Sequence, residues 1–132
     1  MRYLLDTNAL ISILNDTAGC VAQRLKQYSH ADIGLSSIVI NELYYGAFKS
    51  KRRDRNLAIV ESLQFEIISF DPEDARHAGE IRAQLANRGT PIGSYDLLIA
   101  GQARSRGLIL VTRNMREFQR VPELHIENWE ES

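Results

Sequence analysis

Short, mainly apolar segments alternate with longer segments of helical periodicity along this chain. The first is Tyr3-Leu4-Leu5, and similar runs recur at residues 33–36, 65–70 and 108–112. A short apolar run of this kind predicts a strand buried on both faces, as in a parallel sheet. Because helices separate the strands, we expect an α/β fold, with helices on both faces of a parallel sheet of about four to five strands. The 132 residues suffice for one domain, 1–132, with a core of its own.

The boundaries of the helices are marked by capping residues. Asp71 and Pro72 form a strong helix start, with Asp74 in the first turn, and Gly89 follows the end of the same helix. We therefore assign Asp71 and Asp74 to capping rather than to chemistry, and we expect His77 to be structural. The expected helices cover residues 8–14, 21–28, 37–49, 55–63, 72–88 and 95–106, and a short edge strand is expected at 125–129.

Composition excludes several classes of protein. The net charge is -1, which gives no overall basic field for nucleic acid. Residues 49–53 are a basic loop, most simply a solvated turn, with phosphate-backbone contact as the alternative. A single cysteine, Cys20, permits no intramolecular disulfide and fits a reducing, cytoplasmic setting, and we expect it to be buried. No signal peptide or membrane-spanning run is expected.

The first strand leads directly into Asp6, Thr7 and Asn8. Ligands bind at the carboxyl ends of the strands in open parallel sheets, so Asp6 is a candidate site residue. The alternative is that Asp6 or Thr7 only caps the following helix. The two interpretations are equally supported by this segment alone.

Two more acids lie on helix faces that we expect to be apolar. Glu42 falls within the stripe formed by Ile38, Val39, Leu43 and Gly46. A carboxylate in such a stripe is costly unless it is paired, protonated or bound to a cation, although a Glu at the edge of the stripe could reach solvent. Asp96 lies in line with Ala100 and Ala103, which predicts that it faces inward, whereas its place in the first turn also suits the helix dipole.

The fourth expected strand, 108–112, ends in a second polar segment, which contains Thr112, Asn114 and Glu117. In a parallel sheet this segment and Asp6 lie at the same edge, so together with Glu42 and Asp96 they predict an acidic pocket. Several adjacent carboxylates require a cation, and hard oxygen ligands favour Mg²⁺ or Mn²⁺ over zinc. Such a site suits hydrolysis of phosphate esters.

Four groups of residues, in order along almost the whole chain, resemble the PIN-domain ribonucleases, and most closely the VapC-type toxins of bacterial toxin–antitoxin pairs. These are Leu5-Asp6-Thr7-Asn8, Asn41-Glu42-Leu43 with Gly46, Pro91-Ile92-Gly93-Ser94-Tyr95-Asp96 with Ile99-Ala100, and Val111-Thr112-Arg113-Asn114 with Glu117-Phe118. The resemblance implies a three-layer α/β/α sandwich and Mg²⁺- or Mn²⁺-dependent endoribonuclease activity on RNA, often structured RNA such as tRNA. It also implies an antitoxin partner, which would wrap the N-terminal helices and block the acidic site, and a homodimer.

The resemblance maps three acids, as catalytic residues and metal ligands, onto Asp6, Glu42 and Asp96. The chain departs from the family pattern at Asn114, where many PIN domains have Asp; Glu117 is the candidate to supply the missing charge. We expect Thr7 and Asn8 to support Asp6 through hydrogen bonds, and Thr112 and Asn114 to be direct or supporting polar contacts.

Other functions are less well supported by the sequence. A non-catalytic RNA-binding module with the same fold would explain the lost charge at Asn114. A haloacid-dehalogenase-type phosphatase needs a second Asp where this chain has Asn8. A generic α/β domain with capping acids does not explain Glu42. Tyr44, Tyr45 and Phe48 are candidates for partner contact or for ordinary core packing.

Overall fold

A five-stranded, fully parallel sheet forms the centre of the molecule in the computed structural model, which describes residues 1–130. The strand order is β3-β2-β1-β4-β5. The strands are β1 (Tyr3–Leu5), β2 (Ile33–Ser36), β3 (Glu66–Ile68), β4 (Ile109–Val111) and β5 (Ile126–Glu127). This confirms the expected parallel sheet of four to five strands, with five strands present.

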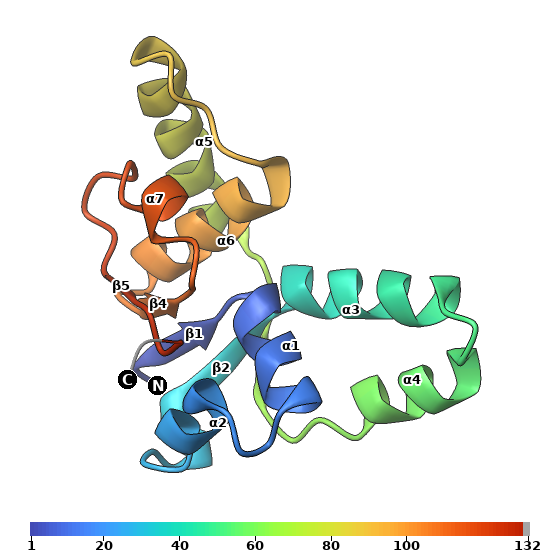
Figure 1. Ribbon diagram of the computed structural model, residues 1–132. Helices are drawn as coiled ribbons and strands as arrows, with labels where there is room; N and C mark the ends of the chain where they lie inside the picture. The colour runs from blue at the N-terminus through green and yellow to red at the C-terminus, as the bar shows by residue number, and fades with distance from the viewer. Residues whose placement is uncertain (131–132) are drawn as a thin grey trace.

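Helices flank the sheet on both sides, which confirms the α/β/α sandwich. In Figure 1, α5, α6 and α7 lie above the sheet, α2 lies below it, α1 lies to its right, and α3 and α4 project together as a hairpin. The helices are α1 (Thr7–Asn15), α2 (Cys20–Leu25), the 3-10 turn η1 (His30–Asp32), α3 (Ser37–Lys49), α4 (Arg53–Glu61), α5 (Pro72–Asn87), α6 (Ser94–Ser105) and α7 (Met115–Phe118). Within residues 1–130, no helix has the length and apolar character needed to span a bilayer.

The predicted helix start at Asp71 is confirmed, and Asp74 has an additional role. The Asp71 and Asp74 carboxylates each accept a hydrogen bond from the backbone N–H of the other residue, at 2.9 Å. Asp74 is also fully buried and accepts hydrogen bonds from Gln102, Ser105 and Arg106. It therefore joins the start of α5 to the end of α6.

The interface between α5 and α6 is unusually close. A Cβ atom added at Gly101 would lie 2.7 Å from the Ala78 Cα, so only glycine fits there. His77 is structural, as predicted, because its Nδ1 accepts a hydrogen bond of 3.0 Å from Arg104 Nε. These contacts fix α6, the helix that carries Asp96, against α5.

Two expectations about burial are wrong. Cys20 is exposed, because it is the first residue of α2 and that helix buries Val21 and Ala22 instead. The buried stripe of α3 is Val39, Leu43 and Ala47, whereas Ile38 is only partly buried and Gly46 is exposed. The real stripe follows a four-residue spacing, which leaves Glu42 partly buried at its edge.

Candidate active site

The carboxyl ends of β1 and β4 meet at the point where the sequence predicts a site. Leu5 pairs with Val111 in the parallel register, and the Asp6 N–H donates to the Val111 carbonyl at 3.0 Å. Asp6 and Thr112 therefore follow neighbouring strands at the same level. Both are buried, with Asp6 4% and Thr112 1% exposed.

Asp6 is both a helix cap and a member of the acidic site, so the two interpretations of its role are compatible. Its Oδ1 accepts a hydrogen bond of 2.7 Å from the Ala9 N–H and thereby caps α1. Burial raises the pKa of Asp6, although a hydrogen bond from Thr112, the Ala9 N–H and the charge of Arg113 oppose this effect. The charge of Glu42 raises the same pKa, so Glu42 acts electrostatically on Asp6.

Asp96 has the most perturbed carboxyl group of the site. Burial raises its pKa to about 7, assisted by a hydrogen bond to Glu117 and by the charges of Glu117, Asp6 and Glu42. Asp96 can thus hold a proton near neutral pH and share it with Glu117. Asp6, Glu42 and Glu117 all act electrostatically on Asp96, but within residues 1–130 no three of these acids converge closely enough to hold a metal ion.

Glu117 is held in its ionised form by two donors. The Gly93 N–H donates to Oε1 at 2.9 Å, and Asn114 Nδ2 donates to Oε2 at 2.7 Å. Burial alone would raise the pKa of Glu117, but these hydrogen bonds, with Asp96 and Arg120, lower it below its usual value. Asn114 therefore orients Glu117, the acid expected from the sequence to supply the charge that is missing at position 114.

The expected hydrogen bonds from Thr7 and Asn8 to Asp6 are absent among residues 1–130. The Thr7 hydroxyl is buried without a hydrogen-bond partner in this part of the chain. Asn8 is exposed and lines a neighbouring cavity of about 580 Å³, together with Arg113. The prediction fails because α1 begins at Thr7, one residue earlier than expected, which turns Asn8 outward.

Gly93 is a member of the site that the sequence interpretation did not single out. It provides a backbone donor to Glu117, and a Cβ atom in its place would lie 3.3 Å from Asp96 Oδ2. A backbone N–H leaves no signal in the sequence. The available indications were that Gly93 lies in a turn-rich loop three residues before a candidate acid and within one of the four residue groups quoted above.

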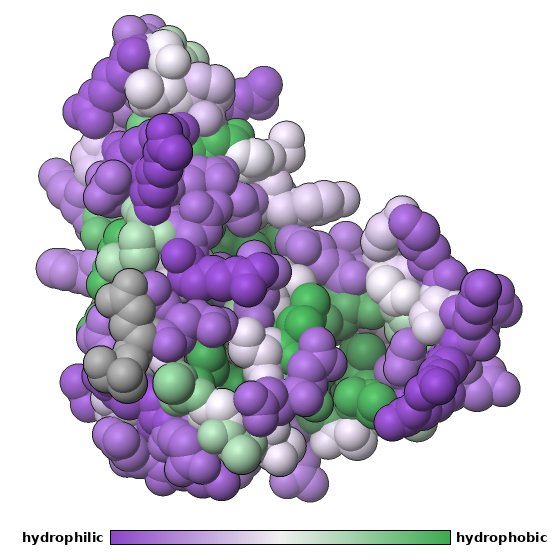
Figure 2. Space-filling view, in the orientation of Figure 1, coloured by the Kyte–Doolittle hydropathy of each residue, from purple (hydrophilic) through white to green (hydrophobic). Residues whose placement is uncertain are grey.

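A groove leads away from Glu42 between α1, α3 and α4. The groove has a volume of about 520 Å³ and is lined by Ile11, Leu14, Leu43 and Val60 on its apolar part. Figure 2 shows this apolar surface in green between α1 and the α3–α4 hairpin. Glu42 thus connects the acidic cluster to an accessible apolar groove.

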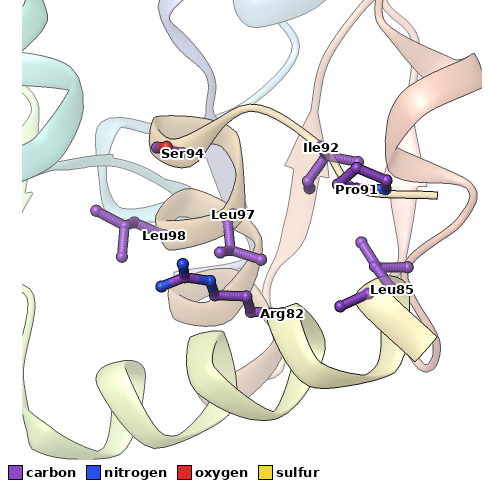
Figure 3. A pocket seen from close by; sticks show the side chains of 8 residues that line it. Arg82, Leu85, Pro91, Ile92, Ser94, Leu97 and Leu98 are labelled. Carbon is purple, nitrogen blue, oxygen red and sulfur yellow. The ribbon is translucent and has the colours of Figure 1, made fainter. Parts of the chain in front are cut away.

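A different cavity, of about 370 Å³, lies between α5 and the start of α6. Figure 3 shows that its lining includes Leu85, Ile92, Leu97 and Leu98, with Arg82 at its side. No acid is among its lining residues within the described part of the chain. It is separate from the acidic cluster.

The raised pKa of Asp96 predicts that Asp96→Asn stabilises the metal-free protein at pH 8. The folded-state pKa of about 7 exceeds the unfolded value of about 3.9, so stability falls as the pH rises between these values. Allowing for solvent screening of this partly exposed group, we expect a gain of about 1 kcal/mol, or about 3 °C in Tm. Thermal unfolding of wild type and Asp96→Asn in EDTA measures this gain, which should shrink at pH 5. A Tm of Asp96→Asn equal to or lower than that of the wild type at pH 8 would contradict the prediction.

Comparison with known proteins identifies close relatives. The family model described as "PIN domain" matches residues 3–124. The "tRNA(fMet)-specific endonuclease VapC" of Salmonella typhimurium is 44% identical over 131 residues, 98% of each chain. "Ribonuclease VapC2" of Haemophilus influenzae is 42% identical, again over 98% of each chain. A crystal structure of DNA-bound VapBC from Salmonella typhimurium superposes with a TM-score of 0.92, at 44% identity and 98% coverage of both chains.

Proposed function

Since this chain belongs to the PIN-domain family and, within it, to the VapC ribonucleases, the toxins of toxin–antitoxin pairs, we propose that its acidic site hydrolyses RNA with the help of Mg²⁺ or Mn²⁺. One observation carries the metal dependence: four carboxylates share one site, and their mutual repulsion helps to raise the pKa of Asp96 to about 7. A bound divalent cation would offset this repulsion. Structured RNA such as tRNA is the proposed substrate, following the tRNA endonuclease among the relatives. With such a substrate, we propose that the protein acts in the cytoplasm.

The donor chemistry of the site fits a hard divalent cation. Asp6, Glu42 and Asp96 offer carboxylate oxygens, which Mg²⁺ and Mn²⁺ prefer. Within residues 1–130, no three His, Cys, Asp or Glu side chains already converge closely enough to hold a metal. Glu42 and Asp96 are only partly buried, so we infer that their side chains rotate toward Asp6 when the cation binds.

The chain's own residues would prepare the site in distinct ways. Asp6 is fixed by the Ala9 N–H and by Thr112, which makes it the rigid member of the ligand set. Glu117, held in its ionised form by Gly93 and Asn114, accepts the hydrogen bond of protonated Asp96. The cation, when bound, would lower the pKa of a water molecule and stabilise the charge that develops on the phosphate. A bound cation would favour the ionised form of Asp96, and its proton would leave to solvent because Glu117, whose pKa is lowered, is the weaker base.

Metal removal tests the proposed function. We expect EDTA-treated protein to leave a purified tRNA pool intact and added Mn²⁺ or Mg²⁺ to restore cleavage, as measured by gel analysis of RNA fragments. Mn²⁺ should also raise the Tm of the wild-type protein, but not that of Asp96→Asn. Equal cleavage in EDTA would contradict metal dependence, and RNA binding without cleavage under every metal condition would favour a non-catalytic binding module.

We propose that the groove beside Glu42 is the binding site of an antitoxin. Several relatives are solved as VapBC complexes, including those of Salmonella typhimurium and Rickettsia felis. An apolar segment of an antitoxin lying in the groove between α1, α3 and α4 would end at Glu42 and cover the acidic cluster. We also propose a homodimer, for which the exposed Tyr45 and Phe48 of α3 are candidate contacts.

A further inference from the structure

The tip of the α3–α4 hairpin concentrates positive charge in a chain that is slightly acidic. Residues 49–55, here called the basic tip, contain five cations and one acid, whereas the whole chain has a net charge of -1. The cations are Lys49, Lys51, Arg52, Arg53 and Arg55, and all are exposed. In Figure 2 the end of the hairpin is strongly hydrophilic.

Apart from the contact of Lys49 with the Tyr45 ring, the fold does not use the charges of the basic tip. The connection between α3 and α4 is held by the Ser50 hydroxyl, which accepts hydrogen bonds from the Arg52 N–H at 3.0 Å and from Asn56 Nδ2 at 2.8 Å. Among residues 1–130, the five cationic side chains form no ion pair and no side-chain hydrogen bond. Lys49 lies over the Tyr45 ring, 5.6 Å from its centroid. The charges of the cations in the basic tip are therefore available to a partner.

The basic tip and the acidic cluster lie on one continuous surface. The groove of about 520 Å³ is lined by Glu42 together with Arg52 and Arg55. Glu42 and Lys49 are on the same helix, and seven residues correspond to about 10 Å along its axis. A polyanion that lies across the acidic cluster thus reaches the basic tip within a few nucleotides.

We propose that the basic tip binds the phosphate backbone of the RNA substrate beside the scissile bond. The inference rests on the proposed function and adds where the substrate is held. Four clustered carboxylates repel RNA, so affinity must come from cations outside the cluster, and backbone contacts supply most sequence-independent affinity for nucleic acids. The basic tip is the concentrated source of such cations on the surface that contains Glu42.

The triple variant Lys51→Gln, Arg52→Gln, Arg53→Gln tests this proposal. We expect its KM for a tRNA pool to rise about 10- to 100-fold at 0.1 M salt while kcat stays unchanged, because about three phosphate contacts are lost. The slope of log affinity against log salt, measured by anisotropy of labelled tRNA in EDTA, should become shallower by about 2. All three side chains are exposed, so the Tm should be retained.

The matched control carries the same loss of charge on another surface. The variant Arg76→Gln, Arg82→Gln, Arg88→Gln changes two exposed cations of α5 and the exposed arginine that caps its C-terminus, and we expect wild-type KM and salt slope. Equal KM and salt slope in the two triple variants would overturn the proposal while leaving the ribonuclease assignment intact. Unchanged RNA affinity with weakened antitoxin affinity would also overturn it, by assigning the basic tip to the antitoxin. Absence of cleavage by the wild type would instead contradict the proposed function, and the anisotropy measurement would still decide the role of the basic tip.

Discussion

Asp6→Asn is expected to lower the rate of RNA cleavage by roughly 10²- to 10³-fold, the range seen when one preorganised electrostatic group is lost from an active site. Asp6 is 4% exposed and lies at the carboxyl end of the central strand, next to Thr112. Burial raises its pKa, and three groups that favour the ionised form, Thr112, the Ala9 N–H and Arg113, oppose this effect. We infer that the charge is retained for chemistry, and the amide of Asn removes it without changing the size of the side chain.

The substitution should leave the fold intact, which makes the loss of activity interpretable. The Asn side-chain oxygen can accept the hydrogen bond that Asp6 now accepts from the Ala9 N–H at 2.7 Å, and Asn is as good an N-cap as Asp. Asp16→Asn is the matched control, because Asp16 is an exposed acid at the other end of α1. Initial rates of tRNA cleavage with Mn²⁺ and thermal unfolding measure the two effects. Wild-type cleavage by Asp6→Asn would refute the role of Asp6.

The central part of the fold follows from patterns that are local in the sequence. A run such as Tyr3-Leu4-Leu5 is buried on both faces, and this property alone places β1 between other strands of a parallel sheet. The edge strands were predicted less accurately. Residues 65–70 and 125–129 give strands of only three and two residues, Glu66–Ile68 and Ile126–Glu127, because an edge strand has one neighbour and its length depends on that pairing.

The acids of the site were predictable because each breaks a local rule. The sequence pattern put Glu42 in an apolar stripe, at whose edge the structure places it, and Asp96 lies in line with the buried Ala100 and Ala103. The contacts between them were not predictable, since they join segments far apart in the sequence. The hydrogen bond from the Gly93 N–H to Glu117 spans 24 residues and involves a backbone donor. The wrong expectation for Asn8 arose from a one-residue shift in the start of α1, which is enough to change the face on which a side chain lies.

Asp74→Asn is expected to destabilise the protein by about 3–5 kcal/mol, the cost of breaking a buried ion pair from one side. The Asp74 side chain is 1% exposed, and its Oδ2 accepts from Arg106 Nη2 at 3.1 Å and from Gln102 Nε2 at 3.1 Å. Burial alone would raise the pKa of Asp74, but hydrogen bonds from Arg106, Ser105, the Asp71 N–H and Gln102 lower it below its usual value. An amide would turn an NH₂ group toward these donors and leave Arg106 without its buried partner.

Two measurements distinguish the buried Asp74 network from an ordinary surface charge: the pH dependence of stability, and a control substitution at the neighbouring Glu73. Because the folded-state pKa of Asp74 is lowered, its contribution is fully present above the ordinary Asp pKa of about 3.9 and is lost as the pH falls through the folded-state value. The stability gap between wild type and Asp74→Asn, measured by urea unfolding, should therefore narrow below about pH 4.

Glu73→Gln is the matched control: Glu73 is in the same turn and pairs with Arg76 at 4.0 Å, but both side chains are 71% exposed. We expect this control to lose less than about 1 kcal/mol. If the two variants lose equal stability, the junction of α5 and α6 rests on the close packing of Gly101 against Ala78 rather than on the buried charge.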